Sequence, residues 1–212
     1  MKSTEFIMEW NPIQRARQEK AEQFNANEQK FIQIGKKCKP YLSQVQDPFN
    51  LYRGVSGTDD AIIKKRIRLD NREPLGMAPT MQTMVNKYFN EKFGAPFRFS
   101  ALCTGEEWVA EGFGDVYAIF PIGDFKFLWA NDVEDLNEHI WSFEESFGDY
   151  VGYSDITQFL NDKDYRTDDI NSAIASGKEI MLRAAGYYGI HKNYINGNET
   201  QIQKLLEIGM EQ

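Results

Sequence analysis

The chain has 212 residues, of which 42% are hydrophobic and 14% aromatic, so it can bury a sizeable core and is not a disordered chain. Its formal net charge of −8 disfavours nonspecific binding to nucleic acid. The two cysteines and two histidines lack the spacing of a zinc site, so we expect no metal. No stretch approaches the roughly 18 apolar residues that cross a bilayer. Residues 1–10 lack the apolar core of a signal peptide, and we expect a cytoplasmic protein with no membrane partner.

The N-terminal half is predicted to be mainly helical. Asn11 followed by Pro12 is typical of a helix start, and Gly94 follows a run of apolar residues with helical spacing. The expected elements are a polar helix over 12–37, a strand over 49–55, a short helix over 58–68, a loop over 71–79 and an amphipathic helix over 80–93. The best basic patch is formed by Lys64, Lys65, Arg66 and Arg68. We expect it to be the solvated face of the short helix.

The C-terminal half is predicted to contain most of the strands. We expect strands over 97–102, 116–121, 125–129 and 179–182, with a second aromatic and apolar strand returning after a glycine-containing turn. Helices are expected over 106–112, 132–147, 154–160, 167–175 and 199–208. Helices early and strands late predict an α+β fold. We expect one domain over residues 46–212, preceded by a helical extension over residues 1–45.

Three polar residues stand out because each is predicted to lie at the end of a strand. Arg53 lies between Tyr52 and Gly54, where its guanidinium can fork onto a pyrophosphate or ribose and the glycine allows a ligand to approach the backbone. Ser100 can orient a neighbouring carboxylate. Glu179 opens a buried strand, and a lone carboxylate near a core costs several kcal/mol unless something binds it. Such a carboxylate can stabilise a developing oxocarbenium ion.

Each of these residues also has an ordinary structural interpretation. Arg53 fits a surface salt bridge, Ser100 a local turn bond, and Glu179 a charged residue that protects an edge strand. The joint occurrence of the three residues favours a functional site. Other enzyme classes find little support, because the chain contains neither a phosphate-binding glycine-rich motif nor a nucleophile with a nearby histidine.

These segments together resemble the ADP-ribosyltransferase family in its Arg-Ser-Glu form. Leu-Tyr-Arg-Gly at 51–54 resembles the aromatic-Arg first strand of that family, and 99–102 resembles its Ser-Thr-Ser strand with only the first serine kept. Residues 110–113 and 116–119 resemble the turn and strand that follow. Residues 178–190 resemble the last motif, with Glu179 as the catalytic glutamate. The resemblance covers about residues 49–191 and implies a split β-sandwich with flanking helices that holds NAD in a central cleft.

The resemblance also implies a role for each site residue. Arg53 would hold the phosphate-ribose arm of NAD, and the backbone of Gly54 would bind the nicotinamide carboxamide. Ser100 would brace Glu179 and contribute to NAD binding. Two aromatic residues are candidates for stacking on the nicotinamide ring, namely Tyr52 and Phe113, although Phe113 fits an ordinary core position equally well.

The implied activity is mono-ADP-ribosyl transfer. NAD would be cleaved at the nicotinamide glycosidic bond, and ADP-ribose would pass to a macromolecular acceptor, expected to be a protein. Two departures from the family pattern matter: Ala101 replaces a hydroxyl residue, and Gly177 replaces an acid that the family associates with arginine modification. They favour an acceptor other than arginine, unless a nearby acid such as Asp168 or Asp169 substitutes. The alternative from another class is a non-catalytic binding or virion-associated protein on the same fold.

Overall fold

The computed structural model describes residues 12–70, 76–147 and 151–212 of the chain. The predicted cap at Asn11, the expectation for residues 1–10 and part of the loop predicted over 71–79 lie outside these ranges. The described residues form helices and two antiparallel sheets joined by loops, so the predicted α+β class is confirmed. Within these ranges, no helix is both long and apolar enough to cross a membrane.

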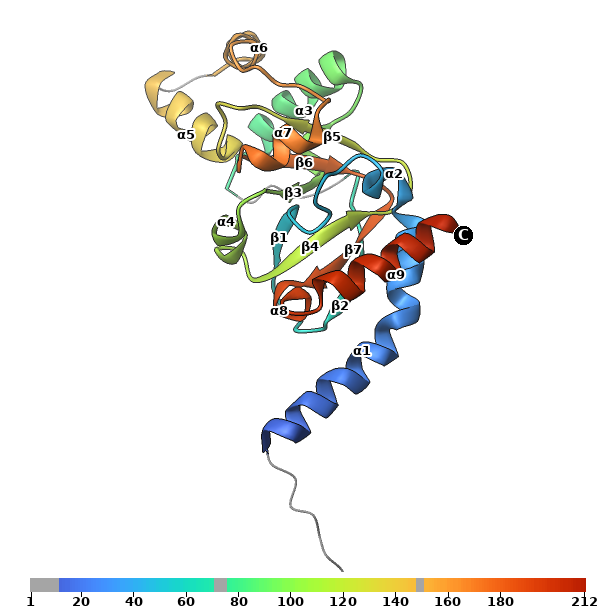
Figure 1. The fold of residues 1–212 in the computed structure, drawn as a ribbon. Helices are drawn as coiled ribbons and strands as arrows, with labels where there is room; N and C mark the ends of the chain where they lie inside the picture. Colours follow the sequence, from blue (N-terminus) through green and yellow to red (C-terminus); the bar gives the residue numbers. More distant parts are fainter. Residues whose placement is uncertain (1–11, 71–75, 148–150) are drawn as a thin grey trace, which may run out of the picture.

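A four-stranded and a three-stranded sheet form the centre of the molecule (Figure 1). The four-stranded sheet has the order β1 (Tyr52–Val55), β4 (Asp115–Pro121), β7 (Gly186–His191) and β2 (Ile62–Arg66). The three-stranded sheet has the order β3 (Ala101–Cys103), β6 (Ile180–Arg183) and β5 (Lys126–Trp129). The strands at 180–183 and 186–191 therefore follow each other in the chain but belong to different sheets, and they do not form a hairpin.

The helices divide between the two sheets (Figure 1). Next to the four-stranded sheet lie α1 (Pro12–Lys37), α2 (Lys39–Leu42), α4 (Glu107–Glu111), α8 (Lys192–Ile195) and α9 (Glu199–Glu211). Next to the three-stranded sheet lie α3 (Pro79–Phe93), the 3₁₀ helix η1 (Phe97–Phe99), α5 (Leu136–Phe147), α6 (Tyr153–Asn161) and α7 (Ile170–Ala175). The predicted helix over 80–93 is confirmed, and Gly94 ends it with a left-handed φ of 73°.

The three-stranded sheet separates two apolar cores. Because side chains alternate along a strand, Ile180 and Leu182 of β6 face the core shared with the four-stranded sheet. Met181 faces the opposite way, into a second core formed with α3, α5 and α6. All three side chains are fully buried. This burial fixes the register of β6 and so the position of Glu179, which directly precedes it.

The prediction of a helix over 58–68 is wrong, because residues Ile62–Arg66 form strand β2. Ile62 and Ile63 are β-branched and pair with Ile190 and Gly189 of β7, so strand pairing outweighs the local helix signal. The basic residues that follow are exposed along the edge of the sheet and not along a helix. Charged side chains on an edge strand discourage pairing with other chains.

The strand predicted over 97–102 is also shorter than expected. Phe97–Phe99 form the 3₁₀ helix η1, and the strand begins at Ala101. Ser100 lies between the two, and its backbone N–H donates to the carbonyl of Phe97 at 2.9 Å. Of the three polar residues that were predicted on strands, Arg53 alone lies within one. Ser100 and Glu179 each directly precede a strand.

The two sheets meet at one edge through a pair of backbone hydrogen bonds. The N–H of Tyr52 donates to the carbonyl of Thr104 at 2.7 Å, and the N–H of Thr104 donates back at 2.9 Å. This bridge joins the start of β1 to the end of β3. It brings the segment that carries Arg53 beside the segment between β3 and α4.

The second half of α1 lies beside α9 next to the four-stranded sheet, and the first half of α1 extends away from the sheets (Figure 1). The two helices approach closely at two glycines: a Cβ atom at Gly35 would lie 2.1 Å from the carbonyl oxygen of Leu206, and one at Gly209 would lie 2.1 Å from that of Ile32. The second half of α1 contributes to the core shared with the four-stranded sheet, where Phe31 is fully buried. The domain boundary near residue 45 stays a prediction.

Candidate functional site

A cleft of about 920 Å³ opens where the two sheets meet. It is lined by residues of β1, β2, η1, β3 and α4 and by the two segments 134–138 and 176–179. This volume lies within the range of pockets that bind small molecules and cofactors. Five of the residues predicted for the site line the cleft, namely Tyr52, Arg53, Gly54, Phe113 and Glu179.

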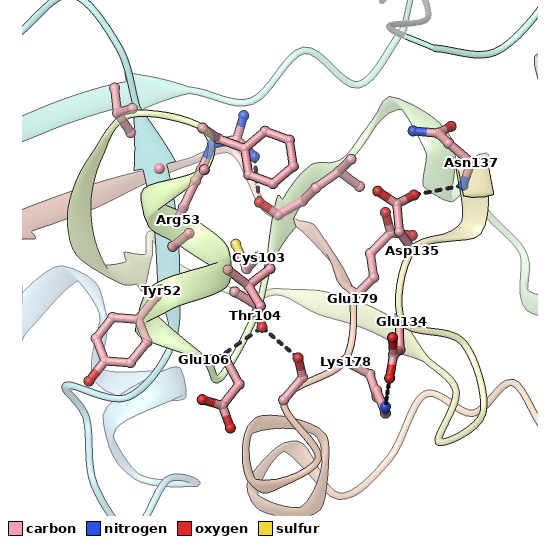
Figure 2. Close-up of a pocket in the computed structure, with 18 of the residues that line it drawn as sticks. Tyr52, Arg53, Cys103, Thr104, Glu106, Glu134, Asp135, Asn137, Lys178 and Glu179 are labelled. Atoms are coloured by element: carbon pink, nitrogen blue, oxygen red, sulfur yellow. Dashed lines mark hydrogen bonds and ion pairs between the residues drawn. The ribbon is translucent and has the colours of Figure 1, made fainter. Parts of the chain in front are cut away.

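Arg53 enters the cleft from β1 (Figure 2). Its Nη1 atom donates a hydrogen bond of 2.5 Å to the carbonyl oxygen of Leu102 in β3, across the junction of the two sheets. A guanidinium carries five N–H donors, so this bond orients the group and uses one of them. Lys65 and Arg66 of β2 also line the cleft and add positive charge to it.

Glu179 lies at the start of β6 and is held by a buried arginine. Its side chain is 8% exposed, and its two carboxylate oxygens lie 2.9 and 3.1 Å from Nη1 of Arg98. Arg98 is fixed in turn, because its Nη2 donates to Oδ1 of Asn137 at 2.8 Å and its backbone N–H donates to Oδ1 of Asn86 at 2.9 Å. Arg98 is therefore the partner of the Glu179 carboxylate that the structure shows, and the sequence analysis did not point to it.

Burial and charge act on the Glu179 carboxyl group in opposite directions. Burial raises its pKa above the ordinary glutamate value, and the Arg98 guanidinium opposes that rise. The negative charge of Asp135, which lines the same cleft, adds to the rise. Arg98 thus favours the ionised form of the carboxylate, whereas burial favours the protonated form.

Ser100 is fully buried and is not among the residues that line the cleft. The turn of η1 directs the chain so that Arg98, two residues earlier, lines the cleft. The predicted contact of Ser100 with NAD therefore finds no support in the cleft. Its role as a brace for Glu179 stays a prediction.

Gly54 has a packing role that the sequence did not reveal. A Cβ atom at this position would lie 2.1 Å from the carbonyl oxygen of Ala110 and 2.8 Å from Cβ of Phe113. The glycine therefore allows the end of α4 to lie against β1. The predicted bond between its backbone and a carboxamide stays a prediction.

The two aromatic candidates differ in exposure. Phe113 is 66% exposed at the cleft, so its alternative interpretation as a core residue is wrong. Tyr52 is 5% exposed, and its hydroxyl donates to Oδ1 of Asn50 and accepts from Nζ of Lys192, both at 3.0 Å. Phe113 is therefore the better placed of the two for stacking on a bound ring.

Asp168 and Asp169 were predicted to supply the carboxylate that Gly177 lacks, but neither lies in the cleft. Asp169 caps α7, where its carboxylate accepts hydrogen bonds from the backbone N–H and the hydroxyl of Ser172. These bonds lower the pKa of Asp169. The carbonyl of Asp168 accepts from Nε1 of Trp129, and neither aspartate lines the cleft. The prediction that Asp168 or Asp169 takes the place of the missing acid is therefore wrong.

Among the cleft residues that the sequence analysis did not predict, Arg98 and Glu106 matter most for the chemistry. Arg98 carried a signal, because it stands between Phe97 and Phe99 in an otherwise apolar segment. Assigning that segment to a strand made its arginine an outward-facing residue. Glu106 carried no signal of its own, since an acid before a short helix is common at helix starts.

Protein families, curated proteins and solved structures were compared with the chain, and none of the three comparisons found a match. Within residues 12–70, 76–147 and 151–212, no three His, Cys, Asp or Glu side chains are grouped so as to hold a metal ion. The functional argument therefore rests on the chemistry of the cleft.

Proposed function

We propose that the protein is a mono-ADP-ribosyltransferase on an ADP-ribosyltransferase-like split β-sandwich, with NAD as its substrate. The observation that carries this proposal is the meeting of two charged residues in one cleft. Arg53 comes from the four-stranded sheet, and Glu179 precedes a strand of the three-stranded sheet. Both belong to the motifs on which the resemblance rests.

The positive side of the cleft suits the diphosphate of NAD. Arg53, Lys65 and Arg66 line it, and guanidinium groups bind phosphate oxygens with charge-assisted hydrogen bonds. The apolar ring of Phe113 offers a surface for a base or for the nicotinamide. These residues would bind and orient the dinucleotide, while the carboxylate of Glu179 would act on the ribose.

Glu179 would act where positive charge develops. When the glycosidic bond to nicotinamide breaks, the electron pair leaves with nicotinamide and the ribose becomes oxocarbenium-like. A fixed carboxylate in a buried site stabilises that charge, typically by about 3–4 kcal/mol per group. Arg98 would serve as a positioning residue, because it holds both carboxylate oxygens and favours the ionised form.

The test is nicotinamide release from NAD by the purified protein and its Glu179→Gln variant. Glutamine keeps an oxygen for the hydrogen bond from Arg98 but carries no charge, so the buried guanidinium loses its counterion and we expect a lower melting temperature. The rate is therefore measured well below the melting temperature of the variant and expressed per folded molecule. The rate should fall by about 10²–10³, the usual loss when one preorganised electrostatic group is removed. Glu145→Gln, an exposed acid of α5, is the matched control and should keep the wild-type rate. Equal rates for the wild type and Glu179→Gln would refute the catalytic assignment.

A non-catalytic binding protein, such as a virion component, is the second candidate. It is favoured by Ser100, which does not line the cleft, and by the absence of a second hydroxyl at Ala101. A thermal shift separates the candidates. NAD should raise the melting temperature of the enzyme, whereas a scaffold that lost NAD chemistry should show neither the shift nor nicotinamide release.

A further inference from the structure

The space beside Gly177 is filled by a carboxylate from another part of the chain. Gly177 has a left-handed φ of 70°, a conformation that side chains with a Cβ atom rarely adopt. A Cβ atom built there would lie 2.6 Å from Cγ and 3.1 Å from Oε1 of Glu106. The place that a side chain at 177 would take is therefore occupied by the carboxyl group of Glu106, which lines the same cleft as Glu179.

Hydrogen bonds of one buried hydroxyl fix this arrangement. Oγ1 of Thr104 donates to the carbonyl of Gly177 at 2.7 Å and accepts from the backbone N–H of Glu106 at 3.1 Å (Figure 2). A Cβ atom at Gly105, between them, would lie 1.7 Å from the carbonyl oxygen of Ile174. The turn at 104–106 therefore packs backbone to backbone against the segment before Glu179, and contacts of its own backbone hold Glu106 in place.

The carboxylate of Glu106 differs from that of its neighbour in the chain. Glu107 lies outside the cleft lining and forms an ion pair of 3.6 Å with Lys192. Glu106 is exposed at the cleft and has no ion pair among the described residues. The backbone of Glu106 is held in place, and its exposed carboxylate has no ion pair among the described residues, so this carboxylate is available to an incoming cation.

We propose that Glu106 is the catalytic residue that receives the acceptor, and that the acceptor is a cationic nitrogen, either a guanidinium or an amine. This inference rests on the proposed function and names the class of molecule that takes ADP-ribose from the same cleft. Both nitrogen groups are protonated at neutral pH and are poor nucleophiles in that form. A carboxylate beside such a group orients it by charge and takes up its proton, which leaves a lone pair on the nitrogen for the new bond.

The reaction balances with the two carboxylates in separate roles. The acceptor nitrogen forms a bond to C1′ of the ribose, while the bond from C1′ to nicotinamide breaks and its electron pair leaves with nicotinamide. The proton lost by the acceptor nitrogen passes to Glu106. Glu179 stabilises the charge on the ribose and takes no proton. Gly177 therefore does not exclude arginine as the acceptor, because the acid is supplied by the turn before α4.

The experiment compares transfer with hydrolysis in the full-length protein. Labelled NAD is incubated with agmatine as a guanidinium probe, with cadaverine as an amine probe and with N-acetylcysteine as a thiol probe. Nicotinamide release and labelled product are both measured, for the wild type, Glu106→Gln and Glu111→Gln. Glu111 is the matched control, since it is an exposed acid of α4 outside the cleft lining.

We expect the wild type to label agmatine or cadaverine, and the probe that is labelled identifies the source of the nitrogen. In Glu106→Gln the ratio of transfer to hydrolysis should fall by about 10², the lower range for loss of a general base. In Glu111→Gln this ratio should not change. Nicotinamide release by the wild type without labelling of either cation, labelling of the thiol alone, or an unchanged ratio in Glu106→Gln overturns the inference and leaves the proposed function standing. A wild type that releases no nicotinamide overturns both.

Discussion

Glycine residues allow close packing both in the contact between α1 and α9 and in the wall of the cleft, but this packing has a different consequence in each region. In both, glycine lets two backbone segments come closer than any side chain would permit. At Gly35 and Gly209 the close approach allows α1 and α9 to pack together over an apolar core. At Gly105 it brings the turn that carries Glu106 against the backbone at Ile174, and at Gly177 the missing side chain leaves room for the side chain of Glu106. Close packing therefore stabilises the fold in one region and positions charged groups in the other.

The energetics of the two regions differ accordingly. Around α1, buried residues such as Phe31 and Ile34 gain free energy in proportion to the apolar area removed from water. In the cleft wall, Arg98 and Glu179 are nearly as buried but form an ion pair. Such a pair contributes little net stability, because desolvation offsets the attraction, yet breaking it by removing one partner is costly. The comparison predicts that changes near α9 alter stability alone, whereas changes in the cleft wall alter chemistry as well.

The largest effect is expected for Arg98→Met. This change leaves Glu179 buried without its cation, which typically destabilises a protein by about 3–5 kcal/mol. The penalty should shrink as the pH falls, because protonated Glu179 needs no cation. Chemical denaturation at several pH values measures this. Arg183→Met is the matched control: its guanidinium donates to the carbonyl of Pro96 at 2.9 Å and pairs with no acid among the described residues.

Arg98 should also set the pH dependence of nicotinamide release. Burial raises the pKa of Glu179, so the wild-type rate should decline on acidification at a pH above the ordinary glutamate value. Loss of the opposing charge raises the pKa further, and the acidic limb of the rate profile should move to higher pH in Arg98→Met. Arg98→Lys keeps the charge and should move it less. A folded Arg98→Met variant with the wild-type profile would mean that Arg98 has only a structural role.

The sequence predicted the elements that bury one regular face. Apolar residues at helical spacing located α3, and apolar strands located β4 and β6, because burial imposes a period on the residues themselves. It also pointed to Arg53 and Glu179, since charged residues beside apolar strands break that period. Both of these residues line the cleft.

The sequence failed where contacts between distant segments decide the structure. Strand β2 exists because β7, more than 100 residues later in the chain, pairs with it, and no local pattern contains that information. Arg98 is buried because η1 turns it towards Glu179, and Glu106 matters because it lies beside Gly177. The fold class and half of the charged site were predictable. The second carboxylate and the partner of the first were not, since each depends on a tertiary contact.

Arg53→Ala should alter binding more than stability and so sharpens the comparison within the cleft. Its side chain is partly exposed, and its bond to the carbonyl of Leu102 is the contact that the fold would lose. A charged hydrogen bond to a phosphate contributes about 1.5–3 kcal/mol, so the Kd for NAD should rise by roughly tenfold to a hundredfold. Isothermal titration calorimetry measures the Kd, and a melting curve monitors the fold. A variant with a much lower melting temperature whose folded form keeps the wild-type Kd for NAD would assign Arg53 to the structure alone.

The smallest effect is expected for Gly209→Ala, on the other side of the comparison. Alanine favours a helix over glycine by up to about 1 kcal/mol, so propensity alone predicts a more stable protein. Here, however, the new Cβ atom would lie 2.1 Å from the carbonyl oxygen of Ile32, and α1 must move away. Overpacking typically costs about 1–3 kcal/mol, so we expect a net loss of roughly 1–2 kcal/mol in the free energy of unfolding. Lys204→Ala, on the exposed face of α9, should change the free energy of unfolding by less than about 0.5 kcal/mol.

Nicotinamide release per folded molecule should be unaffected by both changes, because the contact between α1 and α9 contributes nothing to the cleft lining. A stabilised Gly209→Ala variant would mean that the two helices separate without loss of packing, and a large drop in its rate would show that the two regions are coupled.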